Sequence, residues 1–165
     1  MTTTTGYTIQ RLSADGEPLM NALLTVFGEA FDDADTYGAR RPRPAYLRQL
    51  LASESFIALV ALEGSQVIGG LAAYELRKFE QERSEIYIYD LAVAGAHRRK
   101  RVATALIREL QRIGAERGAY VIFVQADPPD EPAIALYSKL GVREDVLHFD
   151  IPVQAASAGV PRRLP

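Results

Sequence analysis

The stretch EIYIYDLAVAGAHRRKRVATALIREL, residues 85–110, decides how this chain folds. Its first nine residues are rich in β-branched and aromatic side chains, which predicts a β-strand. After Ala94–His97 comes a basic segment, Arg98–Arg101, and then apolar residues recur at helical spacing from Val102 to Leu110. A helix N-terminus has unpaired backbone N–H groups and carries roughly half a positive charge, and cationic side chains strengthen its attraction for a polyanion. The stretch therefore predicts an anion site where the strand gives way to the helix.

The flanking sequence predicts the rest of the fold. Because a helix separates the strand at 85–93 from a strand at 119–126, these two strands should be parallel neighbours. Glycines 69 and 70 lie inside a strand and suggest a bulge or a close backbone approach. Asp15 is expected to cap the first helix, and Gly141 to end the last one in the left-handed conformation. The other predicted strands are 7–12, 56–62, 67–76 and 142–151, and the other predicted helices are 16–31, 44–51 and 131–140.

These elements indicate an α/β (α+β) fold, with a mixed, mostly antiparallel sheet, one parallel βαβ crossing and helices on both faces. A chain of 165 residues is expected to fold as one domain. We assign that domain to residues 1–152. Residues 153–165 are small, polar and proline-rich, which predicts a flexible C-terminal tail.

Composition excludes several classes of function. The chain is 48% hydrophobic and 24% charged, with a net charge of −2, so nothing draws it as a whole toward nucleic acid or an anionic membrane. It has no cysteine, which excludes disulfides, zinc–thiolate sites and a cysteine acyl-enzyme, and no metal site is expected. No apolar run approaches the roughly 20 residues of a membrane span. The N-terminus lacks a signal-peptide pattern, so we expect a cytoplasmic protein.

Carboxylates gather in three predicted loops and at the end of the central strand. The loops carry Asp32, Asp33 and Asp35; Glu80, Glu82 and Glu85; and Asp127, Asp130 and Glu131. Strand alternation puts Asp90 on the face of Ile86 and Ile88, and Tyr87 and Tyr89 on the opposite face with Leu91, more as core than as catalytic residues. Asp90 is the candidate to hold an ammonium group and accept its proton. The alternative is a carboxylate bonded to loop N–H groups.

The segments HRRKRVATAL and IALYSKLGV resemble the GNAT superfamily of acetyl-CoA-dependent N-acetyltransferases. The resemblance implies that Arg98, Arg101 and Ala103 occupy the motif that wraps the CoA pyrophosphate. Arg101 stands where glycine is usual, and glycine lets a backbone approach the phosphates without a Cβ. The resemblance also implies that Tyr137 protonates the departing thiolate. The remaining residues expected to contact acetyl-CoA are Arg99, Lys100, Val102, Thr104 and Ala133, with the backbone of Leu91, Ala92 and Val93 as oxyanion donors.

A closer likeness covers most of residues 19–151 and is densest from Phe56 onward. FIALVALE, GGLAAYELRKFEQERSEIYIYDLAV and GAYVIFVQAD resemble the type I aminoglycoside 3-N-acetyltransferases. This implies direct acetyl transfer from acetyl-CoA to the 3-amino group of gentamicin-like antibiotics, and hence resistance. An aminoglycoside is a polycation, so its site should be acidic. The expected substrate-binding residues are Asp32, Asp33, Asp35, Glu82, Asp127, Asp130 and Glu131.

Other functions stay open at this point. The acceptor could be another amine, such as a polyamine or a peptide N-terminus, or the chain could bind CoA without turnover. A nucleic-acid module fits less well, because the basic segment lacks interleaved aromatic residues and the chain is net acidic. Superfamily members are often dimers, but no residue here argues for or against a homodimer.

Overall fold

The computed structural model describes residues 2–4 and 6–153. They fall into two compact units, one ending at Asp127 and the other beginning at Pro128. The strands of the first unit are β1 (Thr2–Thr4), β2 (Tyr7–Arg11), β3 (Phe56–Glu63), β4 (Gln66–Arg77), β5 (Ser84–Val93) and β6 (Ala119–Val124). Its helices are α1 (Glu17–Ala30), α2 (Pro44–Leu51) and α3 (Val102–Arg117), with short turns η1 (Ala14–Gly16), η2 (Asp35–Ala39) and η3 (Gly95–His97).

The described strands form one sheet in the order β1-β2-β3-β4-β5-β6. Every neighbouring pair is antiparallel except β5 and β6, which are parallel and are joined through α3. The prediction of a mixed sheet with one parallel crossing is therefore confirmed. Strand β1 lies in the threonine-rich leader, where no strand was expected.

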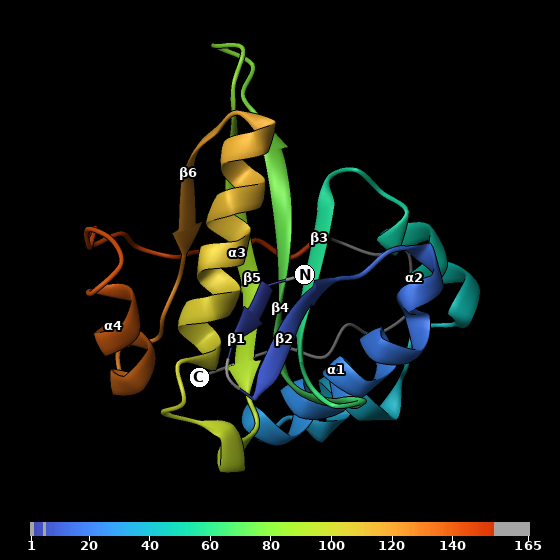
Figure 1. Ribbon diagram of the computed structural model, residues 1–165. Coiled ribbons are helices and arrows are strands. Elements are labelled where there is room, and N and C mark those ends of the chain that lie inside the picture. The colour runs from blue at the N-terminus through green and yellow to red at the C-terminus, as the bar shows by residue number, and fades with distance from the viewer. Residues whose placement is uncertain (1, 5, 154–165) are drawn as a thin grey trace. The chain divides into compact units, whose positions relative to one another are not determined.

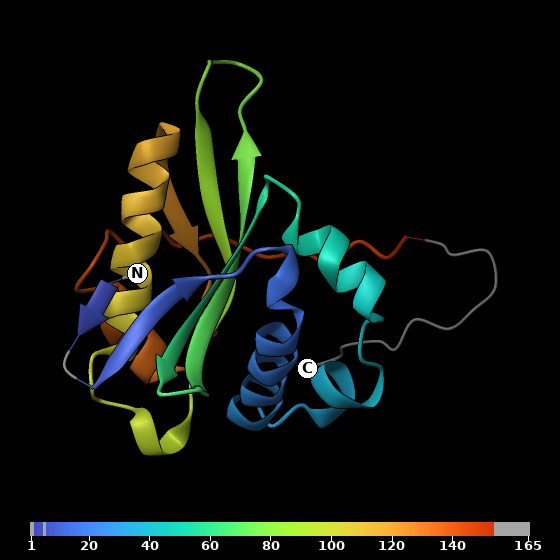
Figure 2. The same cartoon turned by 45° about the vertical axis from the view of Figure 1, so that its right-hand side comes forward.

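Helices cover both faces of the sheet, as predicted (Figures 1 and 2). We name the face that packs against α1 and α2 the α1 face, and the other the α3 face. Gly70 lets α1 approach the α1 face, because a Cβ there would lie 2.6 Å from Leu23 Cδ1 and 2.5 Å from the Leu59 carbonyl oxygen. The close approach expected of the paired glycines is thus confirmed. On the α3 face, Gly114 packs against Ile86.

Helix α3 matches its predicted amphipathic pattern. Val102, Leu106, Ile107, Leu110 and Ile113 are all buried. The helix ends at Gly118, whose φ of 76° is the left-handed conformation that favours glycine. At the first helix the expected cap is wrong: α1 is preceded by Gly16, and no side chain caps it, because Asp15 lies within the 3₁₀ turn η1.

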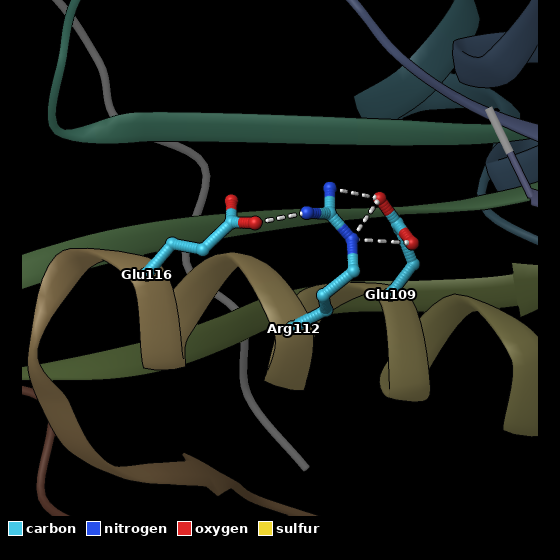
Figure 3. A network of polar contacts seen from close by, with 3 residues as sticks. All are labelled: Glu109, Arg112 and Glu116. Carbon is cyan, nitrogen blue, oxygen red and sulfur yellow. Dashed lines mark hydrogen bonds and ion pairs between the residues drawn. The ribbon is translucent and has the colours of Figure 1, made fainter.

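Charged side chains of α3 form two networks, and one of them includes the buried Glu109. Arg112 donates to both carboxylate oxygens of Glu109 and also contacts Glu116, one turn further along (Figure 3). Near the helix end, Arg117 bonds Glu75 Oε2 of β4 and the Glu54 carbonyl oxygen, each at 2.6 Å. The second of these networks links α3 to the sheet and to the loop before β3.

The second unit contains α4 (Glu131–Tyr137) and no strand among its described residues. The strand predicted at 142–151 is wrong: no ladder pairs with this segment, and its apolar side chains, Phe149 and Ile151 among them, are exposed. Its polar side chains pair locally instead, Arg143 with Asp145 and His148 with Asp150. Strand-forming residues make a strand only where a partner strand accepts their backbone hydrogen bonds.

The predicted end of the last helix also differs. Helix α4 stops at Tyr137, and Gly141 is not left-handed; its N–H instead donates to the Tyr137 carbonyl at 2.9 Å. The predicted tail, 153–165, lies outside the described residues apart from Val153. Within the described residues, no helix is long and apolar enough to cross a lipid bilayer.

Candidate active site

Strand β5 carries a β-bulge at the predicted catalytic aspartate. Ala73 pairs with Ile88 and Ala72 pairs with Asp90, so Tyr89 is an extra residue between the two pairs. The bulge reverses the alternation of side chains. The expectation that Asp90 shares a face with Ile86 and Ile88 is therefore wrong, because it lies opposite Ala72 on the α1 face.

The same bulge corrects the two neighbours of Asp90. Leu91 pairs with Leu71 on the α3 face. The expectation that Leu91 shares a face with Tyr87 and Tyr89 is therefore wrong. Tyr89 is not a core residue, since 62% of it is exposed. The extra residue thus places a tyrosine ring and a carboxylate side by side in the chain on one face of the sheet.

Asp90 lies at a cavity of about 170 Å³ on the α1 face. Apolar side chains of α1, α2 and β3 form much of the wall, and polar groups come from Tyr46, Tyr74, Tyr89 and Asp90. Burial and the neighbouring Tyr46, Tyr89 and Asp90 raise the pKa of Tyr74. Its hydroxyl therefore remains a neutral donor over the physiological range. A carboxylate among phenols and apolar walls suits an amine carried on a larger, partly apolar molecule.

Tyr37 makes a hydrogen bond with Asp90. It lies in η2, and its hydroxyl donates to Asp90 Oδ2 at 2.9 Å. The Tyr37 ring packs against Phe27 and Phe31 of the α1 region, with ring centroids 5.8 and 5.6 Å away. Aromatic packing therefore fixes the hydroxyl that orients the carboxylate. Sequence patterns did not select Tyr37, because the contact joins residues 53 positions apart.

The acidic residues of the same loop surround the Tyr37 turn. Asp33 Oδ1 accepts a hydrogen bond from the Thr36 N–H at 3.0 Å, and Asp35 is the first residue of η2. Asp32 is exposed and has a left-handed φ of 52°. The chain thus brings the predicted acidic group Asp32, Asp33 and Asp35 into the loop that contacts Asp90.

Glu82 lies far from this group. It belongs to the turn between β4 and β5, before Ser84, whereas Asp90 lies near the carboxyl end of β5. Six residues of strand separate them, or about 20 Å. Figure 1 shows the β4–β5 turn and the loop before α3 at opposite ends of the sheet. Glu80 and Glu85 contact Lys78 in that turn.

The edge of β5 is open beside Asp90. The parallel ladder ends where Ile88 pairs with Val124, the last residue of β6, while β5 continues to Val93. In the part of the chain that the structure describes, no strand pairs with residues 89–93 on that side. Backbone groups of Leu91, Ala92 or Val93 that point to this edge are available to a ligand. Asp127 follows β6 by three residues and so lies toward the same end of the sheet.

The predicted anion loop connects this open edge to α3. Arg98, Arg99, Lys100 and Arg101 are all exposed, and Arg98 Nε donates to the Val93 carbonyl at 3.2 Å. Helix α3 begins at Val102, and the Ala105 N–H donates to the Arg101 carbonyl at 3.0 Å. The N–H groups of Val102, Ala103 and Thr104 precede that bond and have no acceptor within the helix. Four cations and a helix N-terminus therefore meet beside the end of β5.

Arg101 adopts the left-handed conformation, with a φ of 64°, and Arg99 does the same, with a φ of 63°. This conformation costs a non-glycine residue roughly 1–2 kcal/mol. The family resemblance implies a glycine at the position of Arg101. A glycine would adopt the left-handed conformation without this cost, and it would also bring no Cβ near a bound phosphate.

The second unit holds the remaining predicted residues. Asp130 caps α4, because its Oδ1 accepts the Ala133 N–H at 3.1 Å, and Glu131 is exposed in the first turn. Burial and the charge of Asp130 raise the pKa of Tyr137 to about 12. The phenol is therefore protonated at neutral pH, as a proton donor must be.

Comparison with known proteins identifies the family of the chain. The profile of the Acetyltransferase (GNAT) family matches residues 20–142. The chain belongs to the GNAT acetyltransferase family. GNAT acetyltransferases transfer an acetyl group from acetyl-CoA, so the chain is an acetyltransferase, and the match includes β5, the basic loop and α4.

Solved GNAT structures resemble this one over almost their whole length. An aminoglycoside acetyltransferase, HMB0005, from an uncultured soil metagenomic sample is 67% identical, with a TM-score of 0.88 over 90% of this chain and 99% of that one. A second, meta-AAC0020, also from an uncultured soil metagenomic sample and in complex with sisomicin, is 29% identical, with a TM-score of 0.85 over 91% and 98%.

Among curated proteins, N-acetyltransferase 8B of Rattus norvegicus is 26% identical over 90 residues. That match covers 54% of this GNAT chain but only 40% of the rat protein.

Proposed function

We propose that this GNAT enzyme is an aminoglycoside 3-N-acetyltransferase, which acetylates the 3-amino group of gentamicin-like antibiotics and thereby confers resistance. The observation that carries the proposal is the position of Asp90, a carboxylate beside an open strand edge and within a cavity of tyrosines. Similarity to the soil aminoglycoside acetyltransferases supports the choice of acceptor. The family match runs through both units, which supports treating residues 1–152 as one catalytic domain.

The loop before α3 fits the pyrophosphate of acetyl-CoA. Its four cations are exposed, and the first N–H groups of α3 lack acceptors within the helix. The open edge of β5 leads from this loop to Asp90 and offers the backbone of Leu91–Val93 to an extended ligand. When bound, acetyl-CoA supplies an acetyl group activated as a thioester.

Asp90 has two tasks in this proposal. Its charge holds the acceptor ammonium at the cavity, and its oxygen then takes the proton that must leave before the nitrogen can attack. Tyr37 keeps the carboxylate in one orientation through its hydrogen bond. N–H donors at the open edge of β5 stabilise negative charge that develops on the acetyl oxygen.

Tyr137 completes the proton balance. Its phenol donates a proton to the thiolate that leaves, and its raised pKa keeps that proton in place until then. The acceptor nitrogen loses two protons between ammonium and amide: Asp90 accepts the first, and the second passes to water after the nitrogen has attacked. Tyr137 gives one proton to the thiolate and is reprotonated through water as Asp90 releases its own, so each turnover releases one proton and restores both side chains. No covalent acyl-enzyme is needed, in agreement with the absence of cysteine.

Acidic residues around the cavity would bind the other amines of the acceptor. Asp32, Asp33 and Asp35 belong to the loop that Tyr37 joins to Asp90, and Asp127 lies toward the same end of the sheet. Asp130 and Glu131 remain proposed contacts from α4. Glu82 is the weakest of the proposed contacts, because the length of β5 separates it from Asp90.

The test is product identification. We would incubate the protein with acetyl-CoA and gentamicin and examine the antibiotic by mass spectrometry and NMR. One acetyl group on the 3-amino nitrogen supports the proposal, and acetylation at another nitrogen retains the substrate class but rejects the position. Parallel reactions with spermidine and a peptide test other amines, and turnover of these alone would reject the aminoglycoside assignment.

A further inference from the structure

Five aromatic rings form a continuous row across β3, β4, β5 and β6. The order is Phe56, Tyr74, Tyr89, Tyr87 and Phe123, with centroids of neighbouring rings 5.1, 6.1, 5.8 and 4.9 Å apart. The outer pair, Tyr87 and Phe123, stacks at 19°. We call these five residues the aromatic row.

The row is buried at one end and exposed at the other. Phe56 is buried, whereas Tyr89 is 62% and Phe123 38% exposed. Single exposed apolar side chains are common on protein surfaces, whereas neighbouring ones that form a contiguous patch often mark a binding site. The exposed part begins at Tyr89, the residue that the bulge inserts next to Asp90.

Polar groups border the row and suit a cationic ligand. Tyr74, Tyr89 and Asp90 line one cavity. The Tyr87 hydroxyl donates to Gln125 Oε1 at 3.1 Å, which leaves its ring face clear of that bond. The face of an aromatic ring is electronegative and attracts cations, and its apolar surface packs against the C–H groups of another ring.

The aromatic rings and the carboxylate together favour a narrower class of amine ligands than the carboxylate alone. Asp90 alone would attract any ammonium group, including that of a flexible linear polyamine. The rings are not coplanar, since neighbouring planes meet at 55°, 78°, 76° and 19°, so the row presents both ring faces and ring edges. Exposed rings beside the carboxylate favour a ligand in which amines are attached to a rigid ring, because such a ligand can place its ring against an aromatic side chain while an amine reaches Asp90. The amino sugars and aminocyclitols of an aminoglycoside have this form.

We propose that the exposed part of the aromatic row, with Tyr89 as its main contact, is the platform on which one ring of the amine acceptor lies during transfer. The proposal rests on the function proposed above, since it names the surface that would recognise that acceptor. Tyr89 is then a specificity residue: its ring, and not its hydroxyl, makes the contact.

The kinetic test compares Tyr89→Ala, Tyr89→Phe and a matched control. Loss of the ring should raise KM for gentamicin about five- to thirtyfold, the range that one exposed to partly desolvated cation–π contact supplies. KM for acetyl-CoA should not change, and Tyr89→Phe, which keeps the ring, should raise KM for gentamicin much less than Tyr89→Ala does. The control is Tyr120→Ala, because Tyr120 is 49% exposed and lies at the start of β6, outside the row. An unchanged KM in Tyr89→Ala, or an equal rise in Tyr120→Ala, overturns the proposal.

A binding experiment separates this proposal from the function on which it rests. Sisomicin is titrated into wild-type protein while the NMR signals of the tyrosine and phenylalanine rings are followed. Shifts at Tyr87, Tyr89 and Phe123 support the platform even if no antibiotic is acetylated, in which case only the proposed function fails. Turnover of gentamicin without these shifts overturns the platform and retains the proposed function. If neither turnover nor shifts are observed, both proposals are rejected. Shifts that follow protein concentration instead of sisomicin would assign the row to self-association and overturn the proposal.

Discussion

The hydroxyl of Tyr37 lies 2.9 Å from Asp90 Oδ2, and this hydrogen bond connects the acidic loop after α1 to the carboxyl-terminal part of β5. The bond joins the proposed base to the loop that carries Asp32, Asp33 and Asp35. If the loop binds an amine as proposed, we expect its binding and the orientation of Asp90 to be coupled through Tyr37.

Substitution of Tyr37 tests this coupling. A hydrogen bond to a charged group contributes about 1.5–3 kcal/mol, so Tyr37→Phe should reduce kcat about tenfold, while KM for acetyl-CoA and the melting temperature change little. Tyr46→Phe is the control, because Tyr46 lines the same cavity, whereas the hydrogen bond to Asp90 Oδ2 that the prediction concerns comes from Tyr37. In an Asp90→Asn background, which should itself have a much lower kcat and a flatter pH profile, the Tyr37 effect should nearly vanish. Additive losses in the double variant would contradict the coupling.

Tyr137→Phe should slow turnover about a hundredfold or more, the usual contribution of a positioned proton donor. Affinity for acetyl-CoA, measured by calorimetry, should be nearly unchanged. Because the pKa of Tyr137 is raised to about 12, its proton is lost only near that pH. Any fall in the kcat of the wild type between pH 8 and 10 must therefore come from another group. The same fall should persist in a Tyr137 variant that retains measurable activity. A wild-type rate in Tyr137→Phe would remove this residue from the mechanism.

The left-handed backbone at Arg101 predicts a stabilising substitution. Arg101→Gly should increase the free energy of unfolding by about 0.5–1 kcal/mol, because the cost of the left-handed conformation exceeds the entropy cost of glycine. The matched control is Lys100→Gly, since Lys100 is equally exposed but has no positive φ, and this change should not stabilise. Thermal and denaturant unfolding measure both. Equal effects of the two glycines would show that backbone strain is not the cause.

Glu75 predicts a pH-dependent contribution to stability. Burial alone would raise its pKa, but hydrogen bonds from Ser84 and Arg117 outweigh burial and lower the pKa below 4.5. A lowered pKa in the folded state gives stability that is present above pH 4.5 and is lost as the pH falls through the folded value. Glu75→Gln should therefore reduce the free energy of unfolding by about 1–2 kcal/mol at pH 7, and less near pH 3.

The control for Glu75 is Glu116→Gln, because Glu116 also contacts an arginine but is largely exposed. Exposed ion pairs contribute little, so this variant should remain within about 0.5 kcal/mol of the wild type at every pH. A Glu75→Gln defect that does not shrink in acid would mean that lost packing, and not the carboxylate charge, is responsible.

The periodicity of apolar residues predicted the helices that pack against the sheet. It failed in β5, where one extra residue interrupts the alternation of side chains between the two faces. The apolar spacing of α3 and the helix between two strands were sufficient to predict the parallel pair. The face of Asp90 was not predictable in this way, because a period of two cannot detect the extra residue at Tyr89. The alternating pattern after Val142 likewise says nothing about whether a partner strand exists.

Two site features left only weak signals in the sequence. Tyr37 follows Phe27 and Phe31 in a loop of acids, which hints at an aromatic cluster, but nothing local indicates its bond to Asp90. The family resemblance implied a glycine at the position of Arg101, and this implication concerned the approach to the phosphates and not the φ of 64°. Both are consequences of three-dimensional contacts or backbone geometry that residue types do not encode.

The bulge in β5 has a consequence for changing what the enzyme accepts. Tyr89 and Asp90 are joined by one peptide bond, so the backbone positions of the proposed ring contact and of the carboxylate are fixed relative to each other whatever the loops do. An engineer who wishes to admit acceptors with a different distance between ring and amine cannot tune one element independently of the other. Such a change would have to alter the loop that carries Tyr37, so that the acceptor binds in a different position, while Tyr89 and Asp90 keep their places in β5.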